Sequence, residues 1–399
     1  MKYVVILGDG MADYPIEELG GRTPLQYADT PAMDELAGKG EVGLADTIPE
    51  GMAPGSDTAN LAVLGYNPRV YYTGRSPLEA LSIGVAMKET DVAMRCNLVT
   101  LSQEDVPYEE RTILDHSSGE ISTEDAKVLL DAVKEAFETE HYHFYVGTSY
   151  RHLLIHEHGS VQPLTPPHDV LERRIGEYLP QDAELRRMME KSYAILNNHP
   201  LNLEREKKGL NKANSIWFWG AGTRPALFSF EEKTGKRGAM ISAVDLLKGI
   251  AVGAGMKVIP VEGADGTLHT NYEGKAQAAV DALLKDDYDF VYVHVEAPDE
   301  MGHQGSLERK LQAISYLDSR VIAPIKTQLD AAGVDYRMLI TPDHPTPVSL
   351  RTHVAEPVPY LIYDSTMQRR RIGFYNEKEA EASGNFFPEG YRLMDYFLK

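Results

Sequence analysis

The sequence predicts an α/β fold: a mostly parallel sheet flanked by helices, with a smaller α+β domain inserted into it. Three unalternating runs of β-branched and aromatic residues, YVVIL, FVYVHV and YRMLI, have the length and pattern of buried parallel strands. Segments of helical composition separate these runs. The chain has 399 residues, more than one typical core holds, so we expect two domains.

The helix expected after the first strand begins in PGSDTANLAVLGYNP, residues 54–68. A proline and a glycine lead directly into Ser56, and alanine and leucine residues follow. Ser56 can be an N-cap that accepts N–H groups lacking a partner in the first turn. It can also be a nucleophile, because those N–H groups and the helix dipole stabilise negative charge.

The middle of the chain has a different pattern. Alternating patches such as VAMRCNLVTL and HFYVGTSYRHLLIHEHG indicate strands, while residues 122–140 and 170–199 indicate helices. This composition is typical of an α+β unit inserted into an α/β domain. We expect a discontinuous phosphatase-like domain of residues 1–84 and 226–399, and an inserted substrate domain of residues 85–225.

The last part of the chain returns to alternating helices and strands. Residues 238–255 and 272–286 have helical composition, and residues 307–333 have amphipathic spacing that closes at Gly333. A short strand, MKVIPVEG, lies between the first two. This βαβ series must join the first strand and the Ser56 helix in one sheet.

Each of the three strand runs breaks at a glycine or proline and then presents acids or histidine. These side chains are Asp9, Asp299, His303, Asp343, His344 and, slightly further along, His353. Ligands of open α/β sheets bind beyond the carboxyl ends of strands, so we expect these side chains to be neighbours. A single aspartate there is more often a cap or turn residue. Six such residues together with Ser56 predict a site for Mn²⁺, Zn²⁺ or Mg²⁺.

The composition excludes several classes of function. The 60 acidic and 40 basic residues give a formal net charge of −20, which argues against a nucleic-acid binder. The single cysteine, Cys96, excludes an intramolecular disulfide and a cysteine-rich metal site. The N-terminal apolar run is too short for a signal peptide, and no stretch has the length of a membrane span. We expect a cytoplasmic protein with no membrane partner; its oligomeric state stays unknown.

The predicted metal ligands also occur in motifs of a known family. Asp9, GSDTAN, APDEMGH, TPDH and His353 together resemble the alkaline phosphatase superfamily of metalloenzymes. Within it, the chain is similar to cofactor-independent phosphoglycerate mutases of the archaeal type. The likeness runs from VVILGDGMAD through SDTANLAVLGYNP, YYTGRSPLEA and HVEAPDEMGH to ITPDHPTP, and so covers nearly the whole chain.

The resemblance implies an alkaline-phosphatase-like fold, an isomerase of glycolysis and a small phosphorylated metabolite as substrate. It implies two divalent metal ions, with Mn²⁺ the first expectation and Zn²⁺ or Mg²⁺ the alternatives. Ser56 would become phosphorylated while phosphate moves between the 3- and 2-positions of glycerate. The resemblance assigns Asp9, Ser56, Asp343 and His344 to one ion, and Asp299, His303 and His353 to the other.

A mutase must also hold the anionic intermediate while it turns over, and arginine forks suit that task. Arg151 in SYRHLL matches a family position and is our first candidate. Arg75 and Arg95 are also retained, either as substrate ligands or as structural ion-pair partners. Asn60 lies one helical turn beyond Ser56, where it could reach a phosphate oxygen or be an exposed polar residue.

Four positions depart from the family pattern. Glu120 in DHSSGEIS and Trp219 in WFWGAG stand where the family has arginine, and Glu262 and Asp265 in EGADG replace proline and threonine. These changes leave open a phosphatase, or a branch with homoserine as the phosphate acceptor. A non-catalytic metabolite binder is a third hypothesis, disfavoured by the intact Ser56 and metal set.

Overall fold

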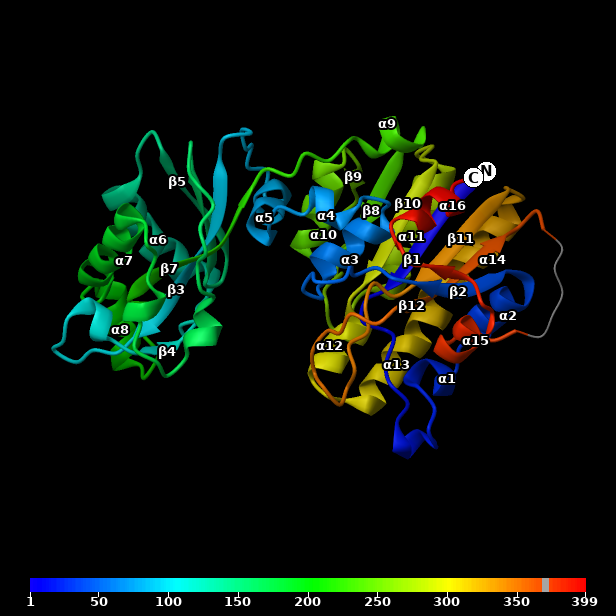
Figure 1. The fold of residues 1–399 in the computed structure, drawn as a ribbon, viewed down its shortest axis with the longest axis horizontal. Coiled ribbons are helices and arrows are strands. Elements are labelled where there is room, and N and C mark those ends of the chain that lie inside the picture. Colours follow the sequence, from blue (N-terminus) through cyan, green and yellow to red (C-terminus); the bar gives the residue numbers. More distant parts are fainter. Residues whose placement is uncertain (368–372) are drawn as a thin grey trace. The chain divides into compact units, whose positions relative to one another are not determined.

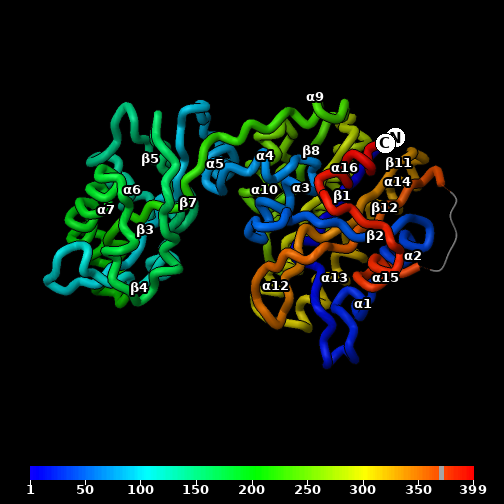
Figure 2. The backbone as a smooth tube through the Cα atoms, in the orientation of Figure 1, coloured from blue at the N-terminus to red at the C-terminus, as the bar shows by residue number. Residues whose placement is uncertain are grey.

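The computed structural model describes residues 1–367 and 373–399. The chain forms two compact units, unit 1 (residues 1–72 and 226–399) and unit 2 (residues 73–225). Figure 1 labels their elements, and Figure 2 shows unit 1 as the blue and the green-to-red parts of the chain and unit 2 as the cyan-to-green part.

The first boundary between the units follows Tyr72, whereas the sequence placed it after residue 84. The helix α5 (Arg75–Ser82) accounts for the difference. Its Ser76 hydroxyl donates to the carbonyl oxygen of Gly220 at 2.5 Å. Its Glu79 also accepts from Arg95, at 2.8 Å between Oε2 and Nε. Both partners belong to strands of unit 2.

Unit 1 contains an eight-stranded sheet in which only the strand β12 runs opposite to the others. The predicted α/β fold with a mostly parallel sheet is therefore confirmed. In spatial order the strands are β13 (Phe386–Phe387), β2 (Glu41–Ala45), β12 (Val358–Asp364), β11 (Tyr336–Thr341), β1 (Lys2–Gly8), β10 (Phe290–Val295), β8 (Gly238–Ile241) and β9 (Lys257–Val258).

The three runs recognised in the sequence are the central strands. β1 pairs in parallel with β10 on one side and with β11 on the other. In this register Gly8 lies opposite Val295, and Leu7 lies opposite Thr341. The residues that follow the three strands therefore emerge together at one edge, as the sequence predicted.

Helices surround this sheet. α2, α11, α13 and α14 share one buried core with β1, β10 and β11. The helices of unit 1 are α1 (Pro24–Tyr27), α2 (Pro31–Lys39), α3 (Ser56–Val63), α4 (Pro68–Tyr71), α9 (Phe230–Thr234), α10 (Asp245–Gly253), α11 (Tyr272–Leu284), α12 (Ala297–His303), α13 (Leu307–Leu317), α14 (Ala323–Ala332), α15 (Glu377–Ala382) and α16 (Arg392–Phe397).

Two helix predictions were wrong in part. Residues 238–255 begin as the strand β8 and become helical only at Asp245, because Gly238–Ile241 pairs with β10. Residues 170–199 form the helix α7 only over Ala183–Leu196. There the Asp182 side chain accepts from two N–H groups of the first turn, and this cap starts the helix.

Unit 2 is an antiparallel sheet with helices, and its own apolar core is separate from that of unit 1. Its strands are β3 (Val92–Leu101), β4 (Ile113–Asp115), β5 (Tyr142–Thr148), β6 (Arg151–His156) and β7 (Ser215–Thr223). Its helices are α5, α6 (Thr123–Phe137), α7 and α8 (Pro200–Lys207). Among residues 1–367 and 373–399, no helix combines the length and hydrophobicity needed to cross a bilayer.

The predicted helix over residues 307–333 is continuous but irregular. α13 passes through a π-helical turn, Asp318–Ile322, into α14, and Gly333 ends it with a φ of 66°. Within this turn Asp318 accepts from the N–H groups of Ala32 at 3.1 Å and Met33 at 2.7 Å. These N–H groups open α2, so Asp318 caps α2 from a distant part of the chain.

This remote cap makes stability depend on pH. Burial raises the pKa of Asp318 to about 6, so the folded protein retains a proton that the unfolded chain releases near pH 4. The contribution of Asp318 to stability is therefore largest below pH 4 and falls as the pH rises to about 6. Asp318→Asn should remove this contribution, so wild type should lose roughly 1–3 kcal/mol more than the variant between pH 4 and 7 in urea unfolding.

The exposed Asp286 offers a matched control. Asp286→Asn should keep the wild-type dependence of unfolding free energy on pH. A parallel pH profile for wild type and Asp318→Asn would show that Asp318 does not titrate in this range.

Candidate active site

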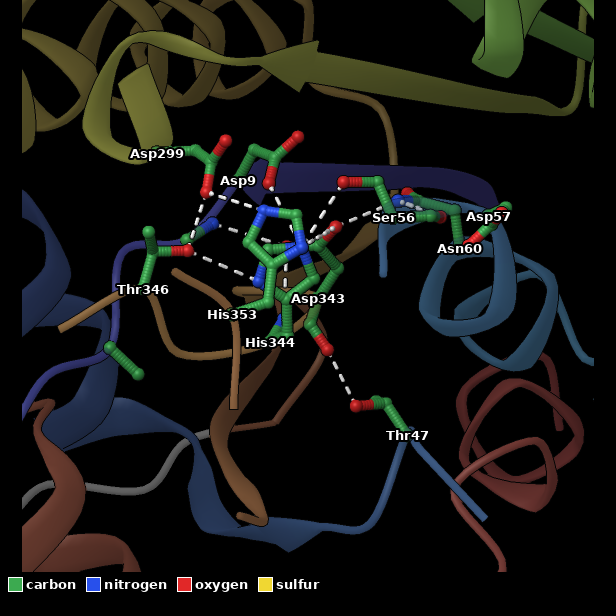
Figure 3. Close-up of polar contacts among 12 residues, drawn as sticks. Asp9, Thr47, Ser56, Asp57, Asn60, Asp299, Asp343, His344, Thr346 and His353 are labelled. Atoms are coloured by element: carbon green, nitrogen blue, oxygen red, sulfur yellow. Dashed lines mark hydrogen bonds and ion pairs between the residues drawn. The ribbon is translucent and has the colours of Figure 1, made fainter. Parts of the chain in front are cut away.

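The candidate site lies where the central strands of unit 1 end (Figure 3). Asp9 directly follows β1, Asp299 lies in the first turn of α12 after β10, and Asp343 with His344 follows β11. Ser56 is the first residue of α3. The view shows the imidazoles of His344 and His353 between the carboxylates, with the Ser56 hydroxyl directed toward them.

One group of potential ligands consists of Asp9, Asp343 and His344. Their ligand atoms lie within 4.8 Å of one another, and all three residues are buried. His344 Nε2 is 3.5 Å from Asp9 Oδ1 and 3.3 Å from Asp343 Oδ2. The Ser56 Oγ lies 3.1 Å from the same His344 nitrogen. The four side chains that the resemblance assigns to one ion are thus brought together.

A second group consists of Asp299, His344 and His353, again with ligand atoms within 4.8 Å. His303 joins it, because its Nε2 is 3.2 Å from Asp299 Oδ2 and 2.9 Å from His353 Nε2. His344 therefore stands between the two groups. Among the residues that the structure describes, these are the two groups of three or more potential ligands.

The crowding of buried acids shifts the pKa values of the site residues. Burial, followed by the repulsion of Asp343 and Asp299, raises the pKa of Asp9 well above its ordinary value. Burial would also raise the pKa of Asp299, but hydrogen bonds from His303 and His353 lower it well below 3.8. The hydrogen bond with Asp299 also raises the pKa of His303, to about 9.

The donor set fits a divalent metal ion. Asp9 Oδ1 is buried and has no hydrogen-bond partner among the described residues. Carboxylates together with imidazoles are the ligands that Mn²⁺ and Zn²⁺ accept, whereas the one thiol, Cys96, is buried in unit 2. An unpaired carboxylate oxygen beside other acids is costly unless a cation compensates it.

Asn60 is fully buried, which excludes the exposed role that the sequence allowed. Its amide nitrogen donates to the Ser56 carbonyl oxygen at 2.8 Å and to Asp343 Oδ2 at 2.9 Å. Its amide oxygen accepts from the Tyr292 hydroxyl at 2.5 Å. Because both N–H bonds are engaged, Asn60 orients Asp343 against the start of α3.

Several supporting residues were missed by sequence reasoning. Thr346 donates its hydroxyl to Asp299 Oδ1, and its hydroxyl oxygen lies 3.2 Å from His344 Nδ1. Tyr292 and His294 belong to β10, and both are completely buried. In the sequence, a tyrosine and a histidine interrupt the apolar run of β10, and this interruption could have indicated that both side chains make buried hydrogen bonds.

Lys310 is a further residue that supports the site, and it is the cationic one. It is completely buried in α13, where the amphipathic spacing could have placed it on the core side. Its Nζ donates to Asp13 Oδ2 at 2.9 Å, to the Thr346 carbonyl oxygen at 2.8 Å and to that of Ala12 at 3.3 Å. It thus ties the loop after β1 to the loop after β11.

The predicted arginines lie in unit 2 and have different surroundings there. Arg95 forms a two-point ion pair with Glu79 and lies 4.5 Å from the centre of the Trp219 ring. Arg75 is exposed, and its Nε is 3.2 Å from Glu79 Oε1. Arg151 is exposed at the start of β6, and no ion pair joins it to an acid within the described ranges.

The residues that depart from the family pattern also have distinct environments. Trp219 donates its ring N–H to Asn97 Oδ1 at 3.0 Å and covers the Arg95 guanidinium. Glu120 is exposed with a φ of 52°. Glu262 and Asp265 are exposed in a loop of unit 1.

We expect Lys310→Met to destabilise unit 1 strongly. The substitution keeps a long unbranched side chain but leaves the Asp13 carboxylate buried without its cation, which typically costs ~3–5 kcal/mol. The midpoint of urea unfolding should fall accordingly. Adding Asp13→Leu should restore part of the loss, because both charges are then removed.

Lys285→Met provides the matched control, since Lys285 is an exposed lysine that pairs with Asp281 one helical turn away. It should leave the midpoint unchanged within error. An equally small effect of Lys310→Met would show that the buried ion pair does not hold the two loops together.

Comparison with known proteins identifies one family. Residues 37–202 match the model of a family described as 2,3-bisphosphoglycerate-independent phosphoglycerate mutase. The enzyme of that name from Methanosarcina acetivorans is 52% identical over 368 residues, covering 91% of this chain and 90% of the relative. A probable mutase of the same kind from Geobacter sulfurreducens is 48% identical over 404 residues, covering 100% of both.

Solved structures share the fold over the whole chain. A protein from Pyrococcus horikoshii has a TM-score of 0.81 at 31% identity, covering 100% of this chain and 96% of the other. The cofactor-independent phosphoglycerate mutase from Thermoplasma acidophilum has a TM-score of 0.66 at 27% identity, covering 100% and 99%. With close to half of its residues identical over its full length, the chain belongs to the 2,3-bisphosphoglycerate-independent phosphoglycerate mutase family.

Proposed function

We propose that this enzyme interconverts 3-phosphoglycerate and 2-phosphoglycerate through a phosphoserine on Ser56. The main support for this proposal is the position of the Ser56 hydroxyl. It lies at the start of α3, 3.1 Å from Nε2 of His344, the histidine that belongs to both ligand groups. Membership of the mutase family supports the choice of substrate. The site resides in unit 1, to which we assign the phosphoryl-transfer chemistry.

We further propose that the site holds two divalent ions, with Mn²⁺ preferred. Asp9, Ser56, Asp343 and His344 would hold one, and Asp299, His303 and His353 the other. When bound, such ions lower the pKa of a serine hydroxyl and neutralise charge on a phosphoryl group. Asp9 Oδ1 is buried and accepts no hydrogen bond from the described residues, which supports a cation there.

The protein's own groups would act in two transfers. In the first, the bond between Ser56 Oγ and phosphorus forms as the bond from phosphorus to the glycerate oxygen breaks. In the second, the other hydroxyl of the retained glycerate takes the phosphoryl group and releases Ser56. The N–H groups of the first turn of α3, apart from that of Thr58, which donates to Asp57 Oδ1 at 2.9 Å, would stabilise the phosphoryl oxygens. Asn60 would keep Asp343 and α3 in register throughout.

Unit 2 is the proposed substrate domain, with Arg151 as the ligand for the glycerate carboxylate or phosphate. Arg151 is exposed at the start of β6, where its guanidinium lies 5.6 Å from the centre of the Tyr150 ring. Arg95 forms an ion pair with Glu79 and packs against the Trp219 ring, which supports a structural role for Arg95. Arg75 shares the same glutamate and is proposed as a weaker candidate.

A second candidate function keeps the phosphoserine and changes the acceptor to water or homoserine. Glu120 and Trp219, which stand where the family pattern has arginine, favour it. The naming of relatives at 48% and 52% identity as mutases favours phosphoglycerate.

Ser56→Ala should abolish the mutase reaction, because alanine has no hydroxyl to carry the phosphate. Removal of a catalytic nucleophile typically lowers kcat by about 10⁴-fold or more. The reaction is followed in a coupled assay for formation of 2-phosphoglycerate. Ser122→Ala is the control, since Ser122 caps α6 in unit 2, and it should retain activity.

The acceptor is decided in the same experiment by measuring phosphate release and homoserine phosphorylation in parallel. The mutase proposal requires conversion of 3-phosphoglycerate to dominate. Rapid phosphate release without that conversion would assign the phosphatase, and activity in Ser56→Ala would remove the serine from the reaction.

Removal of metal should also abolish activity. After treatment with a chelator, the protein should be inactive and should regain turnover when Mn²⁺ is added, with smaller recovery for Mg²⁺. Full activity in protein shown by elemental analysis to be free of metal would contradict the two-ion proposal.

A further inference from the structure

A chain of buried polar groups lies behind the carboxylate of Asp9. It crosses the ends of three neighbouring strands, from Ser242 after β8 through His294 in β10 to Asp9 after β1. His294 is completely buried, and Ser242 and Asp9 are 6% and 2% exposed. His294 Nδ1 lies 3.1 Å from Ser242 Oγ, and His294 Nε2 lies 2.9 Å from Asp9 Oδ2.

The surrounding hydrogen bonds give this chain a direction. An ionised Asp9 carboxylate can only accept, so His294 Nε2 donates to Asp9 Oδ2. Nδ1 of the neutral ring then accepts the hydroxyl proton of Ser242, whose Oγ also accepts from the backbone N–H of Val244 at 3.0 Å. A neutral imidazole that accepts at Nδ1 carries its proton on Nε2. The network therefore fixes both the tautomer and the ring orientation of His294.

This donation leaves the two oxygens of Asp9 with different roles. Oδ2 is held by His294, whereas Oδ1 has no hydrogen-bond partner within the described part of the chain. Oδ1 is also the oxygen that lies 3.5 Å from His344 Nε2, on the side of the candidate cation site. The chain of hydrogen bonds from Ser242 through His294 thus orients Asp9 so that Oδ1 faces the other potential ligands.

The strand β10 supports a second carboxylate in the same way. Tyr292 lies two residues before His294, so both side chains project from the same face of the strand. Tyr292 donates to Asn60, which donates to Asp343. Apolar side chains at these two positions would pack without any cost of burying polar groups. Tyr292 and His294 avoid that cost only because each has a hydrogen-bond partner. Two successive side chains of β10 on that face therefore each stand behind one proposed ligand.

We propose that His294, with its tautomer set by Ser242, is a positioning residue that determines the metal affinity of the site containing Asp9. The inference rests on the proposed metal site, and it assigns to two residues a task that no sequence motif indicated. Groups that orient metal ligands in this way typically change metal affinity by about 10–100-fold when they are lost.

The test measures binding of Mn²⁺ alone to metal-free protein by calorimetry, without substrate. His294→Leu removes the donor and should raise the Kd of one binding event by about 10–100-fold. His294→Gln places an amide N–H near the former Nε2–H and should retain more of the affinity than His294→Leu. Ser242→Ala keeps the imidazole but frees its tautomer, and should produce a smaller rise in the same Kd.

His152→Leu is the matched control, because His152 is a buried histidine of unit 2 whose Nδ1 accepts only a backbone N–H. It should leave Mn²⁺ binding unchanged even if stability falls. If His294→Leu does not fold, His294→Gln and Ser242→Ala carry the test, since each retains most of the packing. Wild-type Mn²⁺ affinity in the folded variants would overturn the proposal, as would equal losses in His294→Leu and His152→Leu.

A mutase assay of wild type separates this inference from the proposed function. Weaker Mn²⁺ binding in the His294 variants of a protein that lacks mutase activity would support the positioning role and reject the mutase. Unchanged Mn²⁺ binding in the variants of an active mutase would reject the positioning role alone. Absence of any Mn²⁺ binding by wild type would overturn both proposals.

Discussion

The structure of unit 1 depends on the repulsion among three carboxylates that the sheet brings to one edge. Asp9, Asp299 and Asp343 are buried after adjacent strands, and burial with mutual repulsion raises the pKa of Asp9 well above its ordinary value. Such a cluster is unfavourable unless cations and hydrogen-bond donors compensate it. Within the protein, the imidazoles and the amide of Asn60 provide this compensation, and the Lys310 ammonium pairs with the neighbouring Asp13.

The compensating groups come from several elements around the sheet. β10 supplies Tyr292 and His294 behind the site, α3 supplies Asn60, and α13 supplies Lys310 beneath the loops. Each contact restrains a carboxylate or the loop that carries one. A rigid set of ligands is what phosphoryl transfer requires, because that chemistry depends mainly on positioning and charge neutralisation.

The sequence was sufficient for features that are local or repeated along the chain. The strand runs, the start of α3 at Ser56 and the acids after each strand follow from composition and spacing, and the parallel sheet then places those acids together. Pairing with β10 overrode the helical composition at residues 238–241, and packing of α5 moved the boundary of unit 2. For His294 and Lys310 the sequence held a signal of burial, but their roles could not be predicted, because these depend on partners that are distant in sequence.

The position of β1 has a consequence for biosynthesis. β1 lies between β10 and β11 in the sheet but precedes them in the chain by about 290 and 330 residues, so it leaves the ribosome well before they are made. Until then its apolar side chains and both of its hydrogen-bonding edges lack their native neighbours, a situation that favours aggregation of nascent chains. Unit 2, formed from one continuous segment, can complete its core during that interval.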